Sequence, residues 1–258
     1  MTNRREFLIA ASAGIAAGTA IGPALSALST RPPIKAIAFD GFPIFDPRPV
    51  FVLAEQLFPG RGAELSNTWR IRQFEYTWLR TAAGQYRDFL AVIEDALVFS
   101  AKSLGLELTP EKRVALVESY LKLKDWPDVK PALMQLRAAG VRLALLNNFT
   151  PTMLATNTRN AGLEGFFEFS LSVDAVRAYK PHPTAYQMGL DAFGLRREEI
   201  LFAAFAGWDA AGAKLFGYPV FWVNRQAQPA EELGAVADAM GAGMADLVRF
   251  VLPRAERS

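Results

Sequence analysis

The side chains best suited to catalysis in this chain follow apolar runs that are typical of buried strands. Asp40 follows "IKAIAF", Asn147 and Asn148 follow "VRLALL", Asp174 and Lys180 come after "FEFSLSV", and Trp208 and Asp209 come shortly after "ILFAAF". In open parallel sheets, ligands bind outside the carboxyl ends of the strands. If these runs are parallel strands, one edge of the sheet brings together a carboxylate nucleophile, an amide pair, a cation and a second acid.

The composition excludes several other kinds of catalytic site. The chain has no cysteine and a single histidine, His182, which lies in the proline-rich stretch "KPHPTAY". Thiolate nucleophiles, disulfides and multi-histidine metal sites are therefore excluded. A Ser-His-Asp triad would depend on that one imidazole and is disfavoured. The chemistry must rest on carboxylates, lysine, arginine, tyrosine and amides.

The charge balance gives no reason to expect a nucleic-acid partner. The 258 residues carry a formal net charge of +2, and 51% of them are hydrophobic. Nucleic-acid binding usually requires a strongly basic patch or stripe, which this balance does not indicate. The composition fits an ordinary globular enzyme.

The N-terminal segment predicts a targeting signal rather than a part of the fold. In "NRREFLIAASAGIAAGTAIGPALSALS", Arg4 and Arg5 precede an apolar stretch and a zone of small residues suited to cleavage. Paired arginines followed by Phe-Leu are similar to a twin-arginine export signal, which the export machinery reads as an address. An uncleaved membrane helix is the alternative, but Ala, Gly and Pro23 make the stretch weakly apolar. We therefore expect residues 1–30 to be a signal peptide and the protein to be periplasmic or secreted.

Strand and helix patterns alternate along the rest of the chain. Five apolar runs rich in β-branched or aromatic residues predict buried strands, and amphipathic helix patterns separate most of them. The runs are "IKAIAF", "VRLALL", "FEFSLSV", "ILFAAF" and "PVFWV". This alternation is typical of an α/β fold, with a doubly wound parallel sheet and right-handed crossovers.

The segment between the first two predicted strands is too long for one crossover and contains no comparable strand. It holds three long amphipathic helix patterns, at residues 63–82, 86–105 and 109–123. We therefore predict a helical cap domain at residues 49–126. The α/β core domain would comprise residues 31–48 and 127–258.

Five stretches resemble the haloacid dehalogenase superfamily, and the resemblance covers nearly all of the chain after the leader. Four of them are similar to its four motifs: "IAFDGFPIFD", "LALLNNFTPTML", "SVDAVRAYKPHPTAY" and "ILFAAFAGWDAAGAKLFGYPVFWVNR". The fifth, "ELSNTWRIRQFEYTWLR", is similar to the helix that carries the halide-binding arginine of the L-2-haloacid dehalogenases. The resemblance implies a Rossmann-like core with an inserted helical cap.

The resemblance also implies roles for particular residues. Asp40 would attack the halogen-bearing carbon of a 2-haloacid and form an ester, which water then cleaves to release a 2-hydroxy acid. Lys180 would neutralise and orient Asp40, and Asp209 would position or activate the water. Members of the family often form homodimers, although no interface can be read from this sequence.

The same resemblance implies a binding site for the substrate and for the departing halide. Arg70, Asn148 and Phe89 match the halide-binding residues, a cation, an amide donor and an aromatic edge. Tyr186 would lie in the substrate pocket and Trp208 would form part of its wall. Asn147 stands where the second motif usually has a serine.

A phosphatase is disfavoured by the residue two positions after Asp40. Phosphatases of the superfamily have an aspartate there to protonate the leaving group, whereas this chain has Phe42, which cannot transfer a proton. A magnesium site would also want two acids where the fourth motif offers only Asp209. Halide leaves as a stable anion and needs neither, so we expect no metal and no cofactor.

Three departures from the family pattern favour a second alternative, a degenerate member that binds small carboxylates with little turnover. The turn "DGFPIFD" is one residue shorter than the usual motif and lacks its Gly-Thr pair. Ala204 and Ala206 replace a serine and an asparagine. Loss of one positioned donor typically slows catalysis by about 10²-fold, so these changes put the rate of ester cleavage in question.

Overall fold

The computed structural model of the protein describes residues 33–252. The predicted signal peptide, residues 1–30, lies outside the described residues. None of the helices within residues 33–252 is long and apolar enough to cross a membrane.

A six-stranded parallel sheet forms the centre of the fold, in the order β3-β2-β1-β4-β5-β6. The strands are β1 (Ala36–Phe39), β2 (Arg142–Asn147), β3 (Phe169–Ser172), β4 (Ile200–Ala204), β5 (Val220–Val223) and β6 (Ala239–Gly241). In register, Phe39 of β1 pairs with Leu145 of β2 and Ala203 of β4. The predicted doubly wound α/β fold is confirmed.

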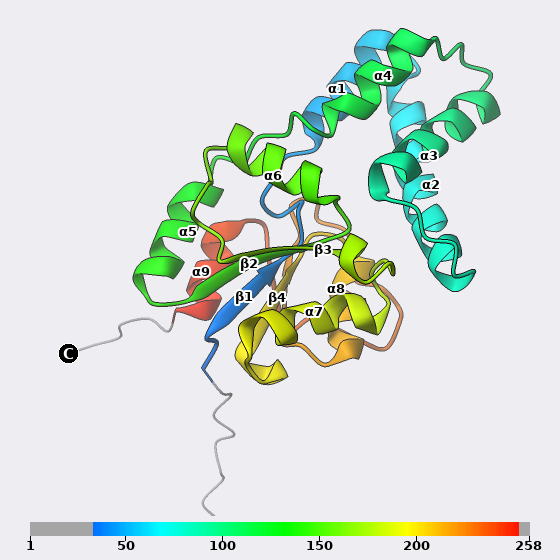
Figure 1. Ribbon diagram of the computed structural model, residues 1–258. Coiled ribbons are helices and arrows are strands. Elements are labelled where there is room, and N and C mark those ends of the chain that lie inside the picture. Colours follow the sequence, from blue (N-terminus) through cyan, green and yellow to red (C-terminus); the bar gives the residue numbers. More distant parts are fainter. Residues whose placement is uncertain (1–32, 253–258) are drawn as a thin grey trace, which may run out of the picture. The chain divides into compact units, whose positions relative to one another are not determined.

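Helices cover both faces of the sheet, as Figure 1 shows. On one face lie α5 (Val129–Ala138), α6 (Pro151–Asn160) and α9 (Met244–Val251), and on the other lie α7 (Pro183–Phe193) and α8 (Gly207–Phe216). Successive residues of β1 pack on opposite sides of the sheet, because successive side chains of a strand point to opposite faces. Ile37 and Phe39 belong to one core cluster, and Ala36 and Ala38 to the other.

Four of the helices between β1 and β2 precede α5 and occupy the segment where the sequence predicted a helical insertion. They are α1 (Arg48–Leu57), α2 (Gly62–Ala82), α3 (Phe89–Ser103) and α4 (Pro110–Ser119). The sequence indicated the last three but not α1, which begins at a proline-flanked arginine. We keep the name "cap" for residues 48–119, because these helices lie apart from the sheet in Figure 1.

Two elements near the C-terminus were missed from the sequence. The sixth strand, β6, has only three residues, Ala-Met-Gly, and is too short to show an alternating pattern. Helix α9 follows it directly and packs against α5. The structure therefore extends the five predicted strands by one edge strand and one covering helix.

Candidate active site

The carboxyl ends of the central strands open onto a cavity of about 370 Å³, which is also lined by cap helix α2. All of the predicted site residues line this cavity except Lys180 and Tyr186, which lie behind it. The lining residues among them are Asp40, Arg70, Phe89, Asn147, Asn148, Trp208 and Asp209. One cavity thus brings together side chains from α2, α3, α8 and the ends of β1 and β2.

Asp40 lies immediately after β1, where strand pairing continues for one more residue. Its backbone N–H donates to the carbonyl of Ala203 at 3.0 Å, so the position of Asp40 is fixed by β4. The residue is 8% exposed and lines the cavity. The N–H group of Phe42 donates to Oδ2 of Asp40 at 3.3 Å. The carboxylate is therefore held at the strand end while remaining open to a ligand.

Lys180 is fully buried and bridges two carboxylates. Its Nζ donates to Oδ1 of Asp40 at 2.8 Å and to Oδ2 of Asp209 at 2.6 Å. Burial alone would lower the pKa of Lys180, but the two carboxylates outweigh it and raise that pKa above its ordinary value. Its backbone N–H donates to Oδ1 of Asn148 at 3.1 Å. Lys180 is thus a fixed cation beside the candidate nucleophile.

Asp209 lies in the first turn of α8 and is 1% exposed. Its Oδ1 accepts a hydrogen bond of 2.7 Å from the hydroxyl group of Tyr186. Burial raises the pKa of Asp209 to about 6, the charge of Lys180 works in the opposite direction, and the nearby charge of Asp40 adds to the rise. Such a carboxylate changes protonation near neutral pH, which suits a group that takes a proton from water.

The structure corrects the expectation that Tyr186 lies in the substrate pocket. Tyr186 is fully buried behind Asp209, between α7 and α8, and does not line the cavity. Gly212 of α8 makes room for it, because a Cβ at this position would come within 2.7 Å of the Tyr186 hydroxyl oxygen. Tyr186 therefore contacts Asp209 rather than the cavity.

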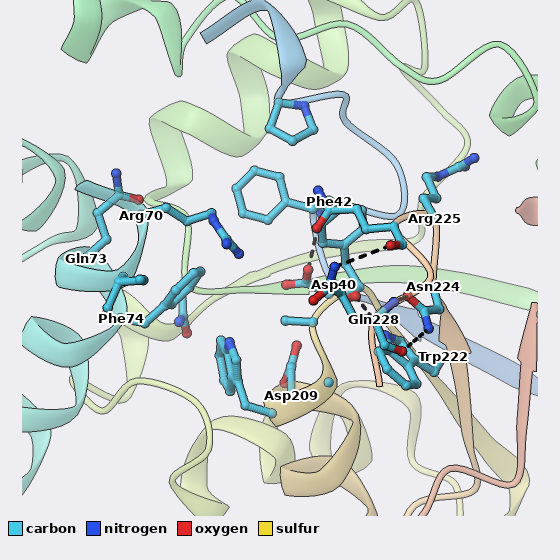
Figure 2. Close-up of a pocket in the computed structure, with 18 of the residues that line it drawn as sticks. Asp40, Phe42, Arg70, Gln73, Phe74, Asp209, Trp222, Asn224, Arg225 and Gln228 are labelled. Atoms are coloured by element: carbon cyan, nitrogen blue, oxygen red, sulfur yellow. Dashed lines mark hydrogen bonds between the residues drawn. The ribbon is translucent and has the colours of Figure 1, made fainter. Parts of the chain in front are cut away.

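The three residues that the sequence predicted to bind the departing halide all line the cavity. Arg70 extends from α2 toward Asp40, as Figure 2 shows. Within residues 33–252, no carboxylate lies within ion-pairing distance of Arg70. Asn148 uses its side-chain oxygen to hold Lys180, which leaves its amide N–H groups as donors. Phe89 is 1% exposed and its ring lies 6.0 Å from that of Phe149.

Asn147 ends β2 and lies against the turn that follows Asp40. A Cβ at Gly41 would come within 2.8 Å of Oδ1 of Asn147, so glycine is needed where the turn passes this side chain. The Nδ2 atom of Asn147 is buried and has no hydrogen-bond partner among residues 33–252. An unpaired buried donor costs free energy, which makes this asparagine an unusual feature of the site.

Sequence reasoning missed an aromatic wall contributed by the cap. Phe74 and Trp78 line the cavity on α2, and their rings contact that of Trp208 with centroids 5.1 and 5.5 Å apart. Residues four apart share one face of a helix. The spacing of Phe74 and Trp78 from Arg70 is therefore the signal that could have found them.

The loop after β5 also reaches the cavity and was not predicted to do so. Trp222 in β5 and Asn224, Arg225 and Gln228 in the loop line the cavity, on the side of Asp40 away from Arg70 in Figure 2. Asn224 and Gln228 bind each other, with the Asn224 amide donating to the Gln228 carbonyl at 2.8 Å and accepting from its N–H at 2.9 Å. The loop is thus a closed, hydrogen-bonded part of the wall.

Comparison with known proteins places these features in a family. A model of the haloacid dehalogenase-like hydrolases matches residues 10–217. The chain is 43% identical over 206 residues to haloacetate dehalogenase H-2 of Moraxella sp. (strain B), covering 80% of this chain and 92% of that protein. It is 41% identical over 206 residues to an (S)-2-haloacid dehalogenase of Pseudomonas sp. (strain YL), with 80% and 89% covered.

Solved structures of L-2-haloacid dehalogenases are also similar to this chain. The crystal structure of an L-2-haloacid dehalogenase matches with a TM-score of 0.84 and 42% identity, covering 85% of this chain and 99% of that one. The L-2-haloacid dehalogenase of Xanthobacter autotrophicus, with chloropropionic acid covalently bound, matches with a TM-score of 0.79 and 33% identity, covering 86% and 100%.

Proposed function

This chain belongs to the haloacid dehalogenase-like hydrolases, and from that premise we propose that it removes halide from short 2-haloacids by hydrolysis, through an ester on Asp40. The observation that carries the proposal is the position of Asp40. A carboxylate bound to a buried lysine faces, across one cavity, an arginine that has no ion-pair partner in residues 33–252. The dehalogenase of Xanthobacter, at 33% identity, has a structure with chloropropionic acid covalently bound.

In the first step, a carboxylate oxygen of Asp40 attacks the halogen-bearing carbon. A carbon–oxygen bond forms as the carbon–halogen bond breaks, and the halide leaves with the bonding electrons. Arg70 and the amide of Asn148 can receive this anion, because both offer N–H donors on the cavity wall. Lys180, whose Nζ lies 2.8 Å from Oδ1 of Asp40, places a positive charge beside the nucleophile and orients it.

In the second step, water attacks the carboxyl carbon of the Asp40 ester. The bond between that carbon and the substrate oxygen breaks, which restores the Asp40 carboxyl group and releases a 2-hydroxy acid. The proton lost by water needs an acceptor, and Asp209 lines the cavity with a pKa of about 6 caused mainly by burial. One oxygen of the new Asp40 carboxylate comes from water.

A phosphatase reaction fits the site poorly. Phosphatases of this fold need a metal ion and an acid for the leaving group, but Phe42 lines the cavity at the position of that acid. The two carboxylates at the strand ends, Asp40 and Asp209, already share the ammonium group of Lys180. Among residues 33–252, no three His, Cys, Asp or Glu side chains are grouped so that they could hold a metal ion.

A weakly catalytic binder remains the second candidate, because Ala206 lines the cavity without offering a donor. The two candidates differ in the second step. A working hydrolase forms and cleaves the Asp40 ester, whereas a degenerate member forms it without releasing product or does not form it.

The test combines chloride release with mass spectrometry. The natural protein and D40N are incubated with 2-chloropropionate in ¹⁸O water, and the intact proteins and the peptide that contains Asp40 are weighed. The natural protein and the control D46N should both release chloride and gain ¹⁸O on Asp40, whereas D40N should do neither. D46N is the matched control, since Asp46 belongs to the same segment but pairs with Arg48 and does not line the cavity. No release and no adduct with any short haloacid would overturn the proposal.

We also propose that residues 1–30 direct export by the twin-arginine route to the periplasm. The support is the sequence alone, Arg4 and Arg5 followed by Phe-Leu and an apolar stretch. Cell fractionation of the full chain and of a variant with both arginines changed to lysine tests this. We expect the natural chain in the periplasm and the variant in the cytoplasm, and an unchanged distribution would contradict the proposal.

A further inference from the structure

The turn after Asp40 has no polar side chain of its own. Residues 41–45 are Gly, Phe, Pro, Ile and Phe, so none can donate from its side chain to the Asp40 carboxylate. The turn closes on the Gly41 carbonyl, which accepts the N–H groups of Ile44 and Phe45 at 3.0 and 2.7 Å. The turn binds the carboxylate through the N–H of Phe42, which donates to Oδ2 at 3.3 Å. The orientation of Asp40 therefore depends on where this peptide group is held.

Two side chains far away in the sequence hold this turn from outside. The indole Nε1 of Trp126 donates to the carbonyl of Phe42 at 2.9 Å. Nη2 of Arg225 donates to the carbonyl of Pro43 at 3.3 Å. The backbone N–H of Trp126 also donates to the carbonyl of Ile44 at 3.1 Å. Three consecutive carbonyl groups of the turn are thus bound by residues from outside the turn.

The two holding side chains are themselves firmly placed. The guanidinium group of Arg225 lies 4.4 Å from the centre of the Trp126 ring. Two nitrogens of Arg225 bind Asp128 at 2.7 and 3.1 Å, and the same carboxylate accepts the N–H of Met244 at 2.9 Å. A bidentate pair of this kind fixes the plane of the guanidinium group. Because Arg225 also lines the cavity, this cluster connects the cavity wall to the turn.

We propose that Trp126 and Arg225 are positioning residues for the nucleophile. By holding the turn, they keep the N–H of Phe42 directed at Asp40 and so fix the rotation of the carboxylate. This inference rests on the proposed function, because the oriented group is the one that attacks carbon. A small misplacement of a reacting group lowers the rate without a matching loss of substrate binding.

The chain offers a variant that separates the hydrogen bond from the packing. W126F keeps an aromatic ring beside Arg225 but removes the Nε1–H that binds the turn. The matched control is R48A. Arg48 also lies 4.4 Å from the Trp126 ring, but it binds Asp46 and has no bond to the carbonyls of the turn. R48A therefore disturbs the surroundings of Trp126 and leaves the bonds to the turn in place.

Two readouts test the proposal. For W126F we expect kcat for chloride release to fall about tenfold with KM nearly unchanged, and R48A to keep the kcat of the natural protein. Hydrogen exchange of the peptide that contains Phe42 should become faster in W126F but not in R48A. R225K, whose ammonium can reach one acceptor but cannot form the fork to Asp128, should lower kcat in the same way.

The outcomes separate this proposal from the proposed function. If the natural protein releases no chloride, the proposed function fails, and the exchange measurement alone decides whether Trp126 holds the turn. W126F with natural kcat and natural exchange would overturn the positioning role. Equal losses of kcat in W126F and R48A that follow their melting temperatures would also overturn it, since they would indicate general destabilisation.

Discussion

The hydroxyl group of Tyr186 donates a hydrogen bond of 2.7 Å to Oδ1 of Asp209. Lys180 holds the other oxygen of the same carboxylate at 2.6 Å. Both donors favour the ionised form of Asp209, whereas burial favours the protonated form and dominates, so its pKa rises to about 6. The hydrogen bond from Tyr186 therefore lowers the pKa of Asp209, the carboxyl group that we assign as the proton acceptor of the hydrolytic step.

The cleavage of the Asp40 ester should slow at acid pH, because protonated Asp209 cannot accept the proton of water. This acid limb should lie below the pKa of about 6 that Asp209 has in the free protein, since the ester removes the Asp40 charge that helps to raise it. Y186F removes a hydrogen bond that lowers the pKa of Asp209, so its acid limb should move to higher pH. Y218F is the control, since Tyr218 is buried nearby and donates to the carbonyl of Tyr186, not to Asp209. Decay of the adduct against pH measures the limb, and an identical limb in Y186F would contradict the assignment.

The raised pKa of Asp209 favours the folded protein at low pH, whereas it slows ester cleavage there. The folded protein binds the proton of Asp209 more tightly than the unfolded chain does, so this group stabilises the fold at low pH. Its contribution is lost as the pH rises from about 4 to about 6. The unfolding free energy of D209N, compared with that of the natural protein at pH 5 and pH 7, should therefore show a relative gain for D209N at pH 7.

Removal of the cation should damage both stability and the first step. K180M leaves two buried carboxylates without their shared partner, which we expect to cost about 3 kcal/mol of unfolding free energy. Adduct formation on Asp40 should fall at least about 10³-fold, because the nucleophile loses the cation that binds and orients it. The double variant K180M/D209N should be less destabilised than the sum of the two single changes. Simple additivity in thermal unfolding would contradict the shared-cation geometry.

How far the fold could be predicted depended on the length of each apolar run. "ILFAAF" predicts a strand because β4 is buried on both faces, and its residues are apolar throughout. In contrast, β6 has only three residues, and its place at the edge is set by pairing with β5. Helix α1 follows Pro47, which can be read as a break but here stands at the helix start.

The candidate site was predictable only where strand ends determine it. Asp40 and Lys180 converge because parallel strands present their carboxyl ends at one edge, and the separation of 140 residues between them does not matter. Trp126 and Arg225 gave no such signal. Their bonds go to backbone carbonyl groups, which every residue carries, so no residue type in the turn points to them.

Arg70 should matter for departure of the halide and not for cleavage of the ester. R70A removes a charged donor of the cap that extends toward Asp40 in Figure 2, so adduct formation should slow by about 10²-fold or more. R72A is the control on the same helix, because Arg72 packs over Phe99 at 4.2 Å, pairs with Glu75 and does not line the cavity. Rapid-quench mass spectrometry separates the two steps. Equal effects of the two variants on adduct formation would count against a halide site at Arg70.

Asn147 and Asn157 offer a test of the unpaired donor. Both side chains are buried, but they differ in their hydrogen bonds. Asn157 accepts the N–H of Leu123 at 3.1 Å and donates to the carbonyl of Tyr120 at 2.9 Å, whereas Nδ2 of Asn147 has no partner. An unsatisfied buried donor already bears the cost of its lost hydration, while a satisfied one gains hydrogen bonds in return.

Truncation to alanine should therefore affect the two sites differently, although it removes the same atoms. N157A leaves a buried N–H and a buried carbonyl unpaired and should lose about 2 kcal/mol or more of unfolding free energy. N147A creates a similar small cavity but also removes the unpaired donor, so these effects should nearly cancel, within about 1 kcal/mol. Urea unfolding of both variants measures the difference. Equal losses would mean that Nδ2 of Asn147 finds a partner in solution, such as an ordered water beside Gly41.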